Sequence, residues 1–258
     1  MCHCGCVHIL QKLCIIDIFL SSIMSKTMKI MSKNFCFKSL ISIFILIYFS
    51  NISHSNPITA WDKASPSVVS VLPTWPGFKK PGFGAPPGTA PEGTGIVISS
   101  LGHILTASHV ISRAKKIEIR DINGNKFDAI LIFNDIKTDL AIIKAEINIA
   151  PIKISIKKPQ IASSTCLISN SFGLDLGITC GVISATGRKN TGFNQIENFI
   201  QTDAAANPGS SGGALVDHNG KLIGMMSGIF TKNTDTNSGV NFAVSSELIL
   251  ETIPFKIN

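Results

Sequence analysis

A serine stands in a glycine-rich bend that opens an apolar run, within Asn207-Pro208-Gly209-Ser210-Ser211-Gly212-Gly213. Because glycine adopts backbone angles that other residues resist, such a bend can aim neighbouring backbone N–H groups at one point. Amides arranged in this way stabilise the negative charge that develops on a carbonyl oxygen under nucleophilic attack. The pattern predicts acyl transfer, with Ser211 as the nucleophile and with Gly209, Ser210 and Ser211 forming an oxyanion hole. Taken alone, the stretch is equally compatible with a flexible turn.

A serine hydroxyl is a poor nucleophile at neutral pH, so it needs a base that accepts its proton and an acid that orients the base. His109 follows an apolar run, and Asp139 begins another, Asp139-Leu140-Ala141-Ile142-Ile143. With Ser211 they give the chain order His, Asp, Ser, which is the order of the chymotrypsin class. We therefore expect His109 to act as the general base and Asp139 to hold its imidazole.

The sequence also contains alternatives to these assignments. Asp135 lies four positions before Asp139 and is a rival acid, although the Asp-Leu-Ala-Ile-Ile block favours Asp139. His103 is predicted to be an exposed strand or turn residue, and His218 precedes an Asn-Gly pair that is typical of a hairpin turn. The bend also matches the Gly-x-Ser-x-Gly pattern of esterases. That fold requires an acid and a histidine downstream of the serine, and the only downstream histidine is the one in the turn.

Three blocks resemble the active-site segments of trypsin-like serine proteases: residues 106–109, 139–144 and 209–213. Finer similarities to the HtrA/Do bacterial proteases lie at residues 123–129, 181–185 and 197–209. The likeness extends from about Trp61 to about Leu250. Two features differ from the family pattern. Ser210 precedes the predicted nucleophile where the family usually has asparagine, and no PDZ domain follows the protease-like segment in this sequence.

The resemblance implies a serine-type endopeptidase that cleaves unfolded or damaged proteins, needs no metal or cofactor, and assembles as a homotrimer through N-terminal contacts. In trypsin, an aspartate six residues before the nucleophile attracts basic side chains; Ala205 stands at that place here, beside Ala206. We therefore expect cleavage after small or medium aliphatic residues. Residues 224–230 are expected to form one wall of the substrate pocket through Met226, Ser227, Gly228 and Ile229. The alternative is a non-catalytic or chaperone-like binding module on the same fold.

Thirteen short Val/Ile-rich runs separated by turn residues predict an all-β fold, the seventh run being residues 152–156. Asn123-Gly124 and Asn219-Gly220 each indicate a hairpin. We expect two six-stranded barrels of the chymotrypsin/trypsin type, at about residues 61–150 and 151–244, followed by a C-terminal helix at about residues 245–253. His109 and Asp139 would come from the first barrel and Ser211 from the second.

Residues 28–55 have the order of a signal peptide, with a basic start, a mostly apolar stretch at Ser39–Ser50 and a small-x-small cleavage site at Ser53–Ser55. An apolar stretch of about 12 residues is shorter than the roughly 20 residues that a membrane-spanning helix needs. We therefore expect cleavage and export to the periplasm or the exterior; an uncleaved leader that tethers the protein to the inner membrane is the alternative. Residues 1–27 are interpreted as a spurious extension, which leaves a protease domain at residues 56–258.

Charge and cysteine content add three expectations. Residues 1–56 contribute +4 of the net charge of +7, and the rest shows no basic stripe, so nucleic-acid binding is not predicted. Cys2, Cys4 and Cys6 resemble a small metal-binding tract, but no second ligand pair follows at zinc-site spacing. Cys166 and Cys180 would reach an oxidising compartment, and we treat a disulfide between them as a hypothesis.

The segment from Pro73 to Gly93 is rich in proline and glycine and predicts a loop. The resemblance implies a short regulatory loop there; a simple surface connection is the alternative.

Overall fold

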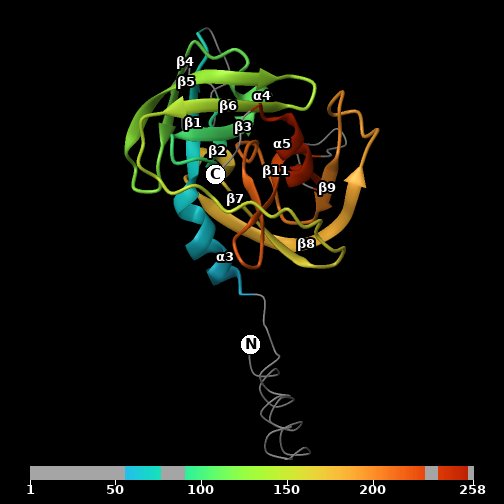
Figure 1. Cartoon of the computed structure of the whole chain (residues 1–258). Helices are drawn as coiled ribbons and strands as arrows, with labels where there is room; N and C mark the ends of the chain where they lie inside the picture. The colour runs from blue at the N-terminus through green and yellow to red at the C-terminus, as the bar shows by residue number, and fades with distance from the viewer. Residues whose placement is uncertain (1–55, 77–90, 230–237, 255–258) are drawn as a thin grey trace, which may run out of the picture. The chain divides into compact units, whose positions relative to one another are not determined.

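Two closed antiparallel barrels are formed by the twelve strands that this computed structural model contains in its described residues, 56–76, 91–229 and 238–254 (Figure 1). The first barrel has the strand order β1-β2-β3-β6-β5-β4, with β1 (Val68–Thr74), β2 (Gly93–Val97), β3 (His103–Ala107), β4 (Lys116–Arg120), β5 (Lys126–Asp135) and β6 (Leu140–Ala145). The second has the order β10-β11-β12-β9-β8-β7, with β7 (Ser164–Ser169), β8 (Gly177–Arg188), β9 (Phe199–Thr202), β10 (Ala214–Asp217), β11 (Leu222–Ile229) and β12 (Asn241–Ser245). The predicted all-β fold with two six-stranded barrels is confirmed.

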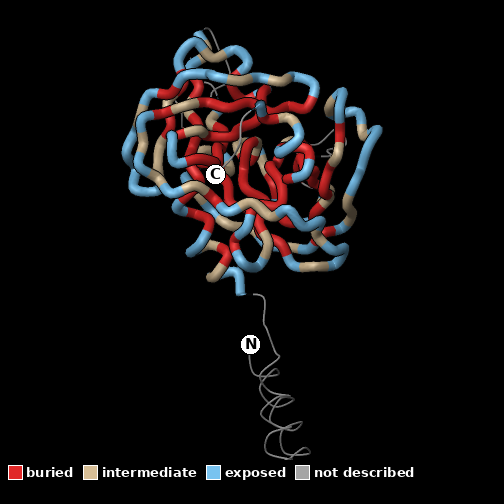
Figure 2. The backbone as a smooth tube through the Cα atoms, viewed as in Figure 1, coloured by how far each residue is buried: buried red, intermediate tan, exposed pale blue. Residues whose placement is uncertain are grey.

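The strands β7, β10 and β11 of the second barrel bury side chains on both of their faces. Leu167, Leu215 and Ile223 belong to a smaller apolar cluster, whereas their neighbours in sequence, such as Cys166 and Val216, belong to a larger cluster that also contains the core of the first barrel. Successive side chains alternate between the two clusters because those of a β-strand point to opposite faces. The red interior in Figure 2 runs through both barrels accordingly. One shared core therefore fixes the two barrels against each other.

Hairpin turns form at the two predicted Asn-Gly pairs. Gly124 connects β4 to β5 with a φ of 86°, and Gly220 connects β10 to β11 with a φ of 74°. In each turn an aspartate closes the loop: Asp121 accepts hydrogen bonds from the backbone of the first turn, and Asp217 does so in the second. These positive φ angles explain why glycine occupies both positions.

Five short helical segments accompany the barrels among the described residues: α3 (Pro57–Ala64), η1 (Ser65–Ser67), α4 (Ser108–Ile111), η2 (Ser171–Gly173) and α5 (Ser246–Thr252). The helix α5 begins where Ser245 accepts a hydrogen bond from Leu248 N, which confirms the predicted C-terminal helix. The helix α3 was not predicted. Its start is marked by an Asn56 cap, which accepts from Ile58 N, and by a proline in the first turn.

The predicted strand at residues 152–156 is wrong. The segment makes a single parallel bridge, between Ile154 and Leu222, and its neighbouring bonds go to both barrels. Ile152 N donates to Val97 O of the first barrel, whereas Lys153 O accepts from Leu222 N of the second. Because its partners lie in two different sheets, the segment cannot continue a ladder in either. It instead fastens the connection between the barrels.

Several predictions fall on residues outside the described ranges. The predicted signal peptide and the cysteine-rich tract lie there, as do residues 77–90 of the predicted loop. The loop's two ends are described: β1 continues to Thr74 and β2 begins at Gly93, so the predicted loop is too long at both ends. Within the ranges that are described, no helix combines the length and the apolar character that crossing a membrane requires.

Candidate active site

Three side chains meet where the barrels face each other. His109 lies on α4, directly after β3; Asp139 ends the turn between β5 and β6; Ser211 precedes β10. His109 Nε2 is 2.9 Å from Ser211 Oγ, and His109 Nδ1 is 2.9 Å from Asp139 Oδ2. The structure therefore brings together the three residues that the sequence predicts as a triad, two from the first barrel and one from the second.

Asp139 is buried and held from several sides. Its Oδ1 accepts a hydrogen bond from the backbone N–H of His109 at 3.0 Å, and its backbone carbonyl accepts one from Ser108 N at 3.1 Å. A carboxylate can only accept, so the His109 Nδ1 beside it is the protonated nitrogen and Nε2 is left to accept from Ser211. The rival acid Asp135 accepts instead from Thr138 Oγ1 and Lys137 N, which closes the turn between β5 and β6.

The bend at residues 207–213 presents two unused amides. Gly209 has a φ of 95°, and neither Gly209 N nor Ser211 N donates a hydrogen bond to another described residue. The carbonyl of Pro208 accepts from Phe172 N at 2.6 Å; because a trans peptide is planar, the Gly209 N–H points to the opposite side. The amide of Ser210 does not join them, contrary to the prediction, because it donates to Asn207 O within the bend.

Thr94 of β2 fastens this bend to the first barrel. Thr94 N donates to Ser211 O at 2.9 Å, and Thr94 Oγ1 donates to Gly209 O at 2.8 Å. The approach is so close that a Cβ added to Gly212 would lie 1.9 Å from Thr94 O. No local pattern indicates this residue's part in the site, because its partners in the bend lie 115 to 117 positions away along the chain.

An open groove of about 540 Å³ runs beside His109. Three residues predicted as a pocket wall line it, namely Ser227, Gly228 and Ile229, together with Ile136 and Phe193. Three others lie elsewhere: Met226 and Ala206 pack in the smaller core cluster, and Ala205 is exposed with its carbonyl accepting from Thr179 Oγ1.

A family model described as a trypsin-like peptidase domain matches residues 93–225, just over half of the chain, and the matched range contains His109, Asp139 and Ser211. The chain belongs to the trypsin-like peptidase family. The resemblance seen in the sequence is thereby confirmed at the level of this family.

More specific similarities are to HtrA-type proteins. The chain is 38% identical over 161 residues to the periplasmic serine endoprotease DegP of Salmonella typhimurium, which covers 61% of this chain and 34% of DegP. It is 38% identical over 160 residues to the periplasmic pH-dependent serine endoprotease DegQ of Escherichia coli, with 60% and 35% covered. The chain thus spans about a third of the length of the curated relatives that it matches.

Solved structures agree with the sequence matches. The HtrA-type protease AlgW with tripeptide superimposes with a TM-score of 0.67 at 36% identity, covering 76% of this chain and 62% of AlgW. A serine endoprotease from Yersinia pestis gives a TM-score of 0.64 at 34% identity, covering 76% of this chain and 64% of that one.

In this trypsin-like domain Ser227 has a contact with the proposed acid that is not predicted from the sequence. Its hydroxyl donates to Asp139 Oδ2 at 2.6 Å, so a residue of the second barrel holds the acid of the first. It is the only side chain of β11 that carries a hydroxyl, amide or charge, which was the available indication that it has a polar partner.

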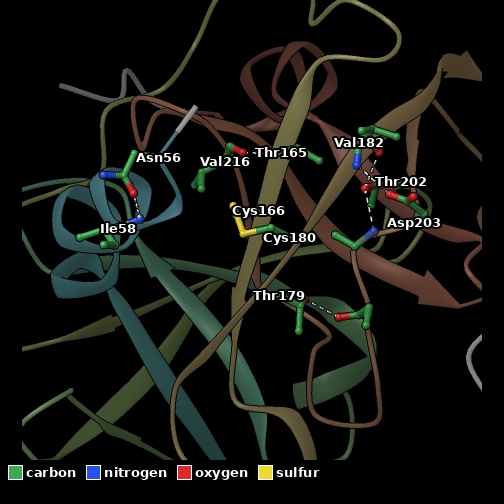
Figure 3. Close-up of a disulfide and its surroundings, with 12 residues drawn as sticks. Asn56, Ile58, Thr165, Cys166, Thr179, Cys180, Val182, Thr202, Asp203 and Val216 are labelled. Atoms are coloured by element: carbon green, nitrogen blue, oxygen red, sulfur yellow. Dashed lines mark hydrogen bonds between the residues drawn. A yellow bond between two sulfur atoms is a disulfide. The ribbon is translucent and has the colours of Figure 1, made fainter. Parts of the chain in front are cut away.

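A disulfide joins Cys166 of β7 to Cys180 of β8 (Figure 3). The two cysteines are directly opposed in the antiparallel register, with their Cα atoms 4.0 Å apart. Thr179 directly precedes Cys180 on β8, and its hydroxyl donates to the Ala205 carbonyl at 2.6 Å, the bond drawn as a dashed line from Thr179 in Figure 3. The disulfide therefore lies in the β7–β8 ladder, and β8 contacts residues 203–205, which precede the Ser211 bend.

The two other described histidines lie outside the site. His103 is half-buried at the start of β3, and burial, followed by the nearby Lys144, lowers its pKa. His218 is exposed in the turn between β10 and β11, beside Asn219. The described part of the chain contains no group of three or more residues that could hold a metal ion.

Proposed function

We propose that this trypsin-like domain is a serine endopeptidase that hydrolyses peptide bonds with His109, Asp139 and Ser211. The observation that carries the proposal is the 2.9 Å distance between His109 Nε2 and Ser211 Oγ, with the opposite ring nitrogen bonded to Asp139. A hydroxyl and a base at hydrogen-bond distance, with the base oriented by a buried carboxylate, form the arrangement that activates serine for attack.

In the proposed reaction, Ser211 Oγ forms a bond to the carbonyl carbon of the scissile peptide while its proton passes to His109 Nε2. The Gly209 and Ser211 amides donate to the resulting oxyanion. His109 then gives the proton to the leaving amine as the carbon–nitrogen bond breaks, which leaves an acyl ester on Ser211. Water attacks the ester, His109 accepts its proton and returns it to Ser211, and the carboxylic acid product leaves. Asp139 stabilises the imidazolium formed in both halves.

The proposed substrates are unfolded or damaged proteins, cut after small or medium aliphatic residues. An open groove beside His109 is suited to an extended chain, and Ile136 on its wall is 77% exposed. Ala205 occupies the sequence position, six residues before Ser211, at which trypsin carries its aspartate, so a lysine or arginine before the cut would lack that counter-ion.

We place the protein in the periplasm or outside the cell. The relatives DegP and DegQ are named periplasmic, and the Cys166–Cys180 disulfide fits an oxidising compartment.

A fluorophosphonate probe and an unfolded protein substrate test the proposal together. Wild-type chain should acquire the probe on Ser211 and should cleave the substrate, with aliphatic residues dominating the position before the cut. The Ser211→Ala variant should do neither while keeping the thermal midpoint of the wild type. The wild-type chain could instead bind unfolded substrate but show neither labelling nor cleavage, even when a peptide activator is added. That result would identify a non-catalytic binding module.

A further inference from the structure

The segment between the last residue of β7 and the start of β8, residues 169–176, contacts the bend before Ser211; we name it the brace loop. Phe172 N donates to Pro208 O, the contact that turns the Gly209 N–H away from the brace loop. A Cβ on Gly209 would lie 2.3 Å from Asn170 O, so the two backbones touch directly. The direction of the Gly209 amide therefore depends on where the brace loop holds its own backbone.

Three serine hydroxyls attach the brace loop to the same bend at a second point. Ser210 Oγ lies 3.0 Å from Ser169 Oγ and 2.9 Å from Ser171 Oγ, and it accepts from Asn207 N at 3.1 Å. A hydroxyl has one proton and two lone pairs, so Ser210 Oγ can donate to one of the two serines while it accepts from the other and from Asn207 N. The buried Ser210 side chain thus ties the residue before the predicted nucleophile to the brace loop.

Asn170 anchors the brace loop in the interior. Its side chain is fully buried, and its backbone N–H donates to Thr94 Oγ1 at 2.9 Å. The side-chain Nδ2 donates to Glu92 Oε2 at 2.6 Å, whereas Oδ1 has no partner among the described residues. Loss of the Glu92 contact would leave both ends of a buried amide unpaired, which a folded protein avoids by moving the group.

Glu92 is itself held by Arg120 of β4. The two guanidinium nitrogens of Arg120 lie 3.4 Å and 2.9 Å from the two carboxylate oxygens of Glu92, and Arg120 also contacts Asp175 of the brace loop at 2.7 Å. The Arg120 and Glu92 side chains are 18% and 22% exposed. Charge-assisted bonds in a fork of this kind are strong and directional. The first barrel therefore holds the brace loop through Glu92 and Arg120 together.

We propose that Glu92 is a positioning residue for hydrolysis, which fixes Asn170 and, through the brace loop, the Pro208–Gly209 peptide with its N–H directed at the oxyanion. The inference rests on the proposed function. Glu92 acts at a distance from the reacting atoms, so its removal affects stabilisation of the transition state and leaves the binding of substrate in the groove intact. This separates it from a residue that merely supports the fold.

The test compares Glu92→Gln with wild type and with Glu118→Gln in the full chain. Glutamine keeps the shape of Glu92 but loses its charge and one acceptor oxygen. Glu118 lies on β4, pairs with Lys116 on the same strand and serves as the matched loss of a carboxylate. Three quantities are measured: kcat and KM on a peptide substrate, the inhibition constant of a peptide boronic acid, whose tetrahedral adduct with Ser211 uses the oxyanion hole, and the thermal midpoint.

Complete loss of an oxyanion donor costs about 10²- to 10³-fold in kcat, so a displaced donor should cost about tenfold or more. We expect this fall in kcat for Glu92→Gln, an equal rise in the boronic acid inhibition constant, an unchanged KM, and the thermal midpoint of Glu118→Gln. The double variant Glu92→Gln with Asn170→Ala should have the same kcat as Asn170→Ala alone, because both substitutions act through one contact.

Wild-type kcat in Glu92→Gln, or a kcat loss without a change in boronic acid inhibition, overturns the positioning role. Failure of the proposed function is a different result: the wild type itself then neither turns over substrate nor reacts with a fluorophosphonate.

Discussion

Ser227 in the second barrel donates a 2.6 Å hydrogen bond to Asp139 of the first, on the carboxylate oxygen that also contacts the His109 ring. This bond connects the proposed acid to the barrel that supplies Ser211. Together with the Thr94 contacts to the Ser211 bend, it makes the arrangement of the three side chains depend on the packing of both barrels.

Replacing Ser227 by alanine should lower kcat/KM by about tenfold to a hundredfold. Hydrogen bonds to charged groups contribute about 1.5–3 kcal/mol, and each 1.4 kcal/mol is about a factor of ten. Steady-state kinetics on a peptide substrate measures the effect. Ser163→Ala is the control, because its hydroxyl donates to Gln160 O on the exposed surface. Equal kinetics in the two variants would show that Asp139 needs no support from the second barrel.

Much of the fold followed from local pattern. The Val/Ile-rich runs and the two Asn-Gly hairpins depend on residues close together in sequence, and both hairpins and twelve of the thirteen predicted strands are present. The three active-site blocks were also visible, because each couples a polar residue to an adjacent apolar strand, as Asp139 does with β6.

The missed features depend on distant partners. The bonds of Ser227 and Thr94 join residues 88 and 115 positions apart, and no local pattern encodes such a pairing. The alternating isoleucines near Ile154 looked like a strand, but their partners belong to two different sheets. Periodicity reports which residues are apolar and leaves open which sheet receives them.

Gly212→Ala should lower the free energy of unfolding much more than Gly124→Ala does. Both glycines have a positive φ, 85° and 86°, so both variants bear a similar backbone cost, about 1–2 kcal/mol. A Cβ on Gly124 meets nothing within 4 Å, whereas one on Gly212 would overlap Thr94 O. Urea unfolding should therefore separate the two variants by more than about 2 kcal/mol, since overpacking costs about 1–3 kcal/mol or more. Similar losses in both would place Thr94 farther from the bend than the structure has it.

Removing the disulfide should lower stability by about 2–4 kcal/mol, the usual contribution of a bridge that closes a short loop. The Cys166→Ala and Cys180→Ala double variant, whose positions are 14 apart, provides the comparison in the absence of reductant. Without reductant, the variant should have a lower urea midpoint than the wild type. Adding reductant should lower the wild-type midpoint by the same amount. A wild-type midpoint that does not respond to reductant would mean that the two thiols are not joined in the purified protein.

Glu197 should make stability fall as the solution becomes acidic. It accepts four hydrogen bonds, from Thr191 N, Thr191 Oγ1, Phe193 N and Asn194 N. Burial alone would raise its pKa, but these bonds to Thr191, Asn194 and Phe193 together lower the pKa below its ordinary value of 4.5. A group with a lowered folded pKa stabilises the protein fully above 4.5, and this contribution is lost as the pH falls through the folded value.

Glu197→Gln removes that titration, so its unfolding free energy should decline less steeply than that of the wild type below pH 4.5. Urea unfolding at several pH values above and below 4.5 gives the slope of unfolding free energy against pH for each protein. Glu251→Gln, on the exposed face of α5, is the control. The carboxylate also orders the loop whose Asn194 side chain donates to Thr138 O, beside Asp139. Enzymatic activity should therefore fall in Glu197→Gln at neutral pH as well, where the control keeps wild-type rates. Parallel slopes for all three proteins would mean that Glu197 titrates alike in the folded and unfolded chain.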